Sequence, residues 1–240
     1  MVKRAFLIGE NQCFAYGDEE PRFLLIQPEG ERAESPVRQP ECISSLCGSS
    51  FLHVSFRVTD WNKELSPWNA APVFGRDAFG NGAAGTLMFI MEKLLPYVRA
   101  EFGIGPIVPM VLGGYSLAAF FALWCAYQTD TFSAIAAASP SVWFPGWIEY
   151  AGARRPLAGC IYLSLGDREK KAKNSILSSV GDCLREQYRL LEESGVRSML
   201  EWNPGNHFTD PELRCAKGFV WCMEKLGEQA DGDNGNHISR

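Results

Sequence analysis

The sequence has no apolar run that approaches the roughly 18 residues of a transmembrane helix. The start of the chain, MVKRAFLIGENQ, places only five apolar or small residues between Arg4 and Glu10, too few for a secretory signal. Basic residues are also scarce, because 23 Lys and Arg against 28 Asp and Glu leave a net charge of −5. Nucleic-acid and membrane-surface binding both need a basic surface, so we expect neither kind of partner.

Paired cysteine spacing is missing as well. The chain has eight cysteines, but none forms a C-x-x-C pair and none has the spacing of a zinc-ligand set. Cys125 and Cys160 lie in apolar runs, as buried small hydrophobic residues do. We therefore expect no metal site and a reducing, cytoplasmic location.

The chain predicts one α/β domain. Strand-like runs cover residues 4–8, 22–27, 51–58, 107–112, 132–138, 160–165 and 196–202. Helices are predicted over 84–102, with a kink at Pro96, over 117–126, within 144–154, and over 174–194 and 211–226. Strands and helices alternate from residue 51 onward, which predicts a mostly parallel, twisted sheet with helices on both faces. We expect a single domain over residues 1–228, a polar flexible tail over 229–240 and a surface loop over 28–40. The long loop over 60–82 holds too many aromatic residues to be merely solvated, and long loops of that kind are usually functional.

The segment 107–126, IVPMVLGGYSLAAFFALWCA, is the most informative part of the chain. A short apolar run leads into Gly114-Tyr115-Ser116-Leu117-Ala118, and a continuous apolar segment follows. A serine in a tight turn between a strand and a buried helix is typical of a nucleophile elbow, in which the flanking positions must be small. An N-terminal helix cap is the simpler role for such a serine, but the flanking pattern favours Ser116 as a nucleophile.

A serine hydroxyl needs an adjacent base, and the chain has only three histidines. His237 lies in the predicted tail, and His53 lies inside a strand, where a packed residue is expected. His207 lies in the loop between the last strand and the last helix, so we predict that it is the base. The carboxylate that orients it should follow a strand between Ser116 and His207. Asp167 and Glu169 both meet that condition; the reach of the longer side chain favours Glu169 and leaves Asp167 as the alternative.

An ester-cleaving site also needs two backbone N–H groups for the developing oxyanion. We expect one from Leu117 and the other from Asp60 or Trp61, after the strand that ends at Val58. Aromatic residues gather in the loop over 60–82 and beside the predicted nucleophile and base. Apolar walls are typical of small-ligand pockets, so we expect five aromatic residues to line the pocket: Trp61, Trp68, Tyr115, Trp143 and Phe208.

Over residues 50–226 the chain resembles the putative esterase family of the α/β-hydrolase fold, which includes esterase D, feruloyl esterases and enterochelin esterases. Five segments carry the resemblance: Gly114-Tyr-Ser-Leu-Ala118, Ala138-Ser-Pro-Ser141 with Trp143-Phe-Pro145, Leu165-Gly-x-x-Glu169, Gly205-Asn-His-Phe208 and the segment 61–68. The resemblance implies an α/β-hydrolase sheet, an acyl-transfer reaction, no cofactor and Glu169 as the acid. It specifies no substrate.

We therefore predict a serine hydrolase that cleaves a small-molecule ester through an acyl-enzyme. The alternatives are an acyltransferase that uses the same acyl-enzyme and a non-catalytic binding protein on a hydrolase scaffold. The sequence leaves the acyl and alcohol groups and the oligomeric state open.

Overall fold

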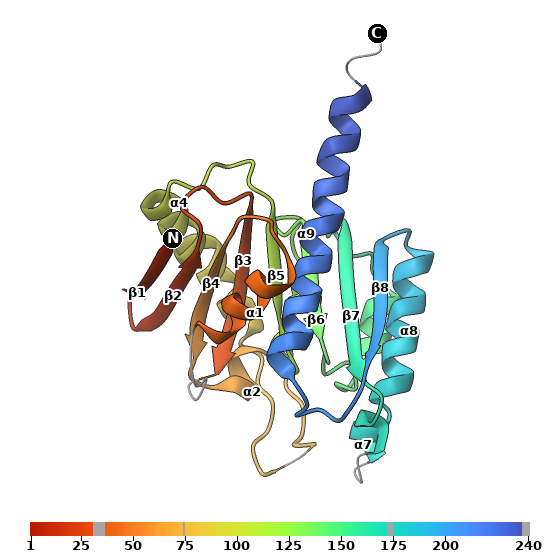
Figure 1. The fold of residues 1–240 in the computed structure, drawn as a ribbon. Coiled ribbons are helices and arrows are strands. Elements are labelled where there is room, and N and C mark those ends of the chain that lie inside the picture. Colours follow the sequence, from red (N-terminus) through yellow and green to blue (C-terminus); the bar gives the residue numbers. More distant parts are fainter. Residues whose placement is uncertain (31–36, 74, 172–174, 237–240) are drawn as a thin grey trace.

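One sheet organises the computed structural model, which describes residues 1–30, 37–73, 75–171 and 175–236. Its strand order is β1-β2-β4-β3-β5-β6-β7-β8 (Figure 1). The strands are β1 (Val2–Ile8), β2 (Asn11–Gly17), β3 (Phe23–Gly30), β4 (Phe51–Val58), β5 (Met110–Tyr115), β6 (Ala134–Ala138), β7 (Cys160–Gly166) and β8 (Arg197–Asn203). β1 and β2 pair antiparallel and form one edge, while β4, β3 and β5 to β8 pair parallel. The predicted mostly parallel sheet is confirmed.

Helices cover both faces of this sheet. They are α1 (Arg38–Leu46), α2 (Trp61–Glu64), α3 (Ala83–Phe89), the π-helix η1 (Ile90–Leu94), α4 (Leu95–Phe102), α5 (Leu117–Cys125), α6 (Trp147–Gly152), the 3-10 helix η2 (Glu169–Lys171), α7 (Ser175–Ser178), α8 (Val180–Glu193) and α9 (Pro211–Asn236). Figure 1 shows α1 and α9 in front of the sheet, with α2 and α7 beyond one end of the strands.

The residues of β3 explain why both faces are covered. Leu24 and Ile26 belong to the larger core, which the helix α5 also enters. Phe23 and Leu25 belong to a second core with residues of α1 and α9. Successive side chains of a strand point to opposite faces. Because residues 23–26 are all apolar, this part of β3 needs a helix layer on each side.

Pro96 changes the predicted helix over 84–102 more than a simple kink would. The segment divides into α3, η1 and α4, with Pro96 in the first turn of α4. Proline has no N–H and its ring collides with the carbonyl four residues earlier. A wider π turn before it accommodates both effects. Gly103, in the left-handed conformation with φ 64°, follows the last residue of α4, Phe102, which is also the predicted end of this helix.

Other boundaries also differ from the sequence prediction. The predicted loop over 28–40 begins with the end of β3 and ends with the start of α1, while residues 31–36 lie outside the described part. The loop over 60–82 contains the short helix α2, and the helix predicted over 174–194 is divided into α7 and α8. α9 continues from Pro211 to Asn236, past the predicted end at 226 and into the predicted tail, of which 237–240 lie outside the described residues.

Candidate active site

Ser116 lies at the carboxyl end of β5, in the turn that opens α5. Its backbone has φ 58° and ψ −119°, a conformation that costs a non-glycine residue about 1–3 kcal/mol. Two backbone hydrogen bonds hold it there: its N–H donates to Ala138 at 3.1 Å, and its carbonyl accepts from Ser141 at 3.2 Å. A Cβ added at Gly114 would lie 2.8 Å from the Cβ of Ala118. The turn therefore needs small residues on both sides of the serine, as the sequence indicated.

Three side chains from separate loops form one chain of hydrogen bonds at this end of the sheet. The Oγ of Ser116 lies 3.1 Å from Nε2 of His207, in the loop after β8. Nδ1 of His207 lies 2.7 Å from Oε2 of Glu169, in η2 after β7. A carboxylate beside Nδ1 selects the tautomer that carries its proton there. Nε2 is then free to accept the hydroxyl proton of Ser116.

The two carboxylates predicted as alternatives lie in different places. Glu169 is 8% exposed and bonds to His207. Burial tends to raise the pKa of Glu169, but hydrogen bonds from His207, the N–H of Gly166 and the hydroxyl of Ser139 outweigh it and lower that pKa below its ordinary value. Asp167 is exposed, and its Oδ1 accepts the N–H of Gly205 at 2.9 Å. Only Glu169 is in hydrogen-bond contact with the imidazole.

Backbone N–H groups without a partner occur in both of the described segments where the oxyanion donors were expected. Within the described part of the chain, neither Leu117 nor Trp61 has a hydrogen-bond partner for its N–H. The N–H of Asp60, the other candidate, donates to Oε1 of Glu64 at 2.7 Å. Because that donor is occupied, the geometry favours Trp61 over Asp60 for the second oxyanion contact.

A cavity of about 540 Å³ opens onto these groups. Ser116, Glu169 and His207 line it, together with three of the five aromatic residues expected there, Trp61, Trp143 and Phe208. Four further lining residues were not predicted to lie there: Asn62, Ser139, Leu177 and Val180. Asn62 and Ser139 belong to segments that carry the family resemblance, but no local pattern marked Leu177 or Val180.

Trp68 and Tyr115, the other two residues predicted to line the pocket, are not among the lining residues of this cavity. The indole of Trp68 donates to the carbonyl of Pro145 at 2.8 Å and packs against Phe144, so it fixes one loop to another. The hydroxyl of Tyr115 donates to the carbonyl of His207 at 2.7 Å. Its ring centroid lies 5.1 Å from that of His207, so Tyr115 packs against the histidine and its loop.

Phe208 and Trp68 provide a matched test of the difference between aromatic residues that line the cavity and those that pack one loop against another. Phe208 lines the cavity and is 86% exposed. We expect Phe208→Ala to raise the KM for an aromatic ester severalfold with little change in the melting temperature, because its ring touches substrate more than core. Trp68→Ala should lower the melting temperature and leave KM nearly unchanged, since it removes packing. Unchanged KM in Phe208→Ala would exclude this residue from the wall.

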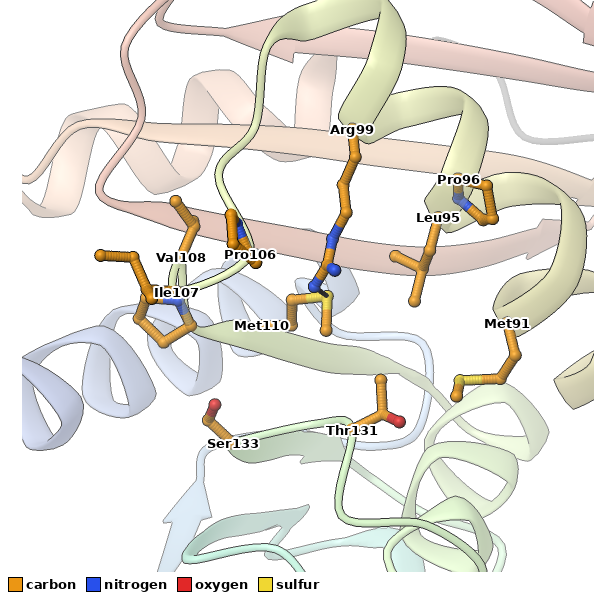
Figure 2. Close-up of a pocket in the computed structure, with 11 residues that line it drawn as sticks. Met91, Leu95, Pro96, Arg99, Pro106, Ile107, Val108, Met110, Thr131 and Ser133 are labelled. Carbon is orange, nitrogen blue, oxygen red and sulfur yellow. Dashed lines mark hydrogen bonds between the residues drawn. The ribbon is translucent and has the colours of Figure 1, made fainter.

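A larger hollow, of about 620 Å³, lies at the amino end of β5 and carries no comparable chemistry. Figure 2 shows Arg99 of α4 reaching toward Met110, with Thr131 and Ser133 across the hollow. Among its lining residues Arg99 is the one ionisable side chain, and neither histidine nor carboxylate is present. The smaller cavity is therefore the candidate site.

The remaining histidines and cysteines do not form a second site in the described residues. His53 is fully buried, and burial lowers its pKa to about 3, so its ring is neutral and bonds to Gln27 at 3.2 Å. His237 lies outside the described residues. No group of three or more potential metal ligands occurs in the described part. None of the helices described there has the length and apolar character to cross a membrane.

The model of a family described as "Putative esterase" matches residues 57–190, more than half of the chain. The chain belongs to this esterase family. The resemblance inferred from its motifs is confirmed, and so is its relation to hydrolases that act on esters. A comparison with curated proteins by sequence gives no match.

Solved structures extend the family assignment to the fold. The siderophore hydrolase EstA from Aspergillus nidulans is similar over 94% of each chain, with a TM-score of 0.70 and 16% identity. The enterobactin esterase FES from Shigella flexneri has a TM-score of 0.69 and 16% identity over 94% of this chain and 60% of its own. A ferulic acid esterase has a TM-score of 0.60 and 14% identity over 92% and 95%. At these identities the likeness shows the α/β-hydrolase fold alone.

Proposed function

We propose that this esterase-family chain is a serine carboxylesterase that works through an acyl-enzyme, with Ser116, His207 and Glu169 as its triad. The observation that carries the proposal is the unbroken hydrogen-bond chain from Ser116 through His207 to Glu169, with distances of 3.1 and 2.7 Å. Three residues contributed by three loops are in the order and contact that such a reaction requires. The alternative acid, Asp167, has no contact of this kind.

Each group has a defined role in the proposed reaction. Ser116 attacks the ester carbonyl while Nε2 of His207 takes its proton, and Glu169 stabilises the imidazolium that forms. The N–H groups of Leu117 and Trp61 stabilise the oxyanion. His207 then protonates the departing alcohol, and a water molecule, deprotonated by the same nitrogen, releases the acid from Ser116.

The cavity also indicates the kind of ester. Glu169 is the only carboxylate among its lining residues, it is paired, and no lysine or arginine lines the described wall. The rings of Trp61, Trp143 and Phe208 present apolar surface instead. An uncharged, flat organic group is the best match for such a wall. By their names, the similar structures act on siderophores, enterobactin and ferulic acid esters, which agrees with a small-molecule ester.

A fluorophosphonate probe tests the proposal directly. We expect one probe molecule to bind each chain and mass spectrometry to place it on Ser116, because only an activated serine reacts with such probes at neutral pH. Prior incubation with a p-nitrophenyl ester should delay the labelling. A chain that stays unlabelled, or that is labelled elsewhere, would support the binding-protein alternative.

The eight free cysteines agree with the proposed reducing location.

A further inference from the structure

Arg214 of α9 lies behind the proposed triad and is 2% exposed. Its guanidinium donates to five oxygen atoms: Oε1 of Glu169 at 3.0 Å, the hydroxyl of Tyr115 at 3.1 Å, Oγ of Ser139 at 3.3 Å, and the carbonyls of Pro204 and Asn206 at 3.0 Å each. We infer that Arg214 is a positioning residue that holds the carboxylate of Glu169 and the loop of His207 in a fixed position relative to each other. This inference rests on the proposed function.

The two terminal nitrogens of Arg214 contact different parts of the site. Nη1 contacts the acid side, namely Glu169, Ser139 and Tyr115, while Nη2 contacts the backbone on either side of Gly205 in the histidine loop. A planar guanidinium holds these two sets at a fixed separation. Lysine is a single point donor on a flexible stem and cannot occupy both positions.

Arg214 also determines which oxygen of Glu169 faces the histidine. Oε1 accepts from Arg214 at 3.0 Å, from the hydroxyl of Ser139 at 2.8 Å and from the N–H of Gly166 at 2.8 Å. Oε2 is left to His207 at 2.7 Å. Three donors on one oxygen fix the rotation of the carboxylate and aim the other oxygen at Nδ1.

The charge balance behind the triad depends on the same residue. A buried carboxylate needs a paired cation, and Arg214 is the buried one that contacts Glu169. Burial raises the pKa of Tyr115 to about 12, so that phenol stays neutral and donates to the His207 carbonyl. The other charged neighbours, Asp167, Arg168 and Lys170, are exposed. Removing the cation should therefore favour protonation of the Glu169–His207 pair.

A comparison of Arg214→Lys and Arg214→Gln with the wild type tests the inference. For variants that keep the wild-type circular dichroism spectrum, we expect kcat to fall by on the order of a hundredfold, the effect of small misplacements in an active site, while KM changes little. In Arg214→Gln the acidic limb of kcat/KM should move to higher pH by about one unit, and Arg214→Lys, which keeps the charge, should move it less. Lys217→Met is the matched control, because Lys217 lies on the same helix as Arg214 and the change removes its ion pair with Glu201 of β8.

Each outcome decides the question. A folded Arg214→Gln with wild-type kcat and an unmoved acidic limb would overturn the inference. Failure of both Arg214 variants to fold, with Lys217→Met intact, would also overturn it, because the arginine would then serve the fold alone. A wild-type chain that neither hydrolyses p-nitrophenyl esters nor reacts with a fluorophosphonate refutes the proposed function instead, independently of the Arg214 variants.

Discussion

Replacing Ser116 with alanine should abolish hydrolysis of a short-chain p-nitrophenyl ester. In the proposed reaction this hydroxyl forms the covalent intermediate, and loss of the nucleophile in a comparable triad lowers kcat by on the order of a million-fold. The remaining rate should be close to that of the ester in buffer. Steady-state kinetics with freshly purified protein at high enzyme concentration would measure it.

The protein should remain folded in this variant. Alanine at position 116 has the same backbone strain as serine at φ 58°, so the melting temperature should change little. Ser133→Ala, in the hollow at the other end of β5, is the control and should retain wild-type turnover. Residual turnover in Ser116→Ala above a small fraction of the wild-type rate would refute the nucleophile assignment.

Glu169→Gln should give the second largest loss of kcat, after Ser116→Ala. The amide keeps the shape of the side chain but no longer selects the tautomer with a proton on Nδ1 of His207, and it cannot stabilise an imidazolium. The equivalent change in a well-studied triad lowers kcat about ten-thousand-fold. Because Arg214 loses its charged partner, the melting temperature should be measured alongside kcat.

Asp167→Asn is the matched comparison for Glu169→Gln. The amide oxygen at position 167 can still accept the N–H of Gly205, the contact that Asp167 makes at 2.9 Å. Near-normal activity is therefore expected. A large loss in Asp167→Asn with near-normal Glu169→Gln would reverse the assignment of the acid.

Much of the architecture could be predicted because it depends on local pattern. β4 begins and ends at the predicted residues, and β5, the serine turn and α5 follow in the predicted order. The helix and strand boundaries that were predicted wrongly lie where tertiary packing overrides the local sequence pattern. The π turn η1 arises where Pro96 must be accommodated within a helix that is packed along the sheet.

The sequence by itself determined the strand–turn–helix around Ser116 and, by its scarcity of histidine, singled out His207. Those inferences need only the period of the apolar residues and the position of strand ends. The tertiary structure decided that Glu169 contacts His207 while Asp167 does not, and that Trp68 packs against a loop outside the cavity. It also brought Arg214 beneath the site from the last helix. These contacts join elements far apart in the chain, so they depend on strand order, register and loop path, which no local pattern encodes.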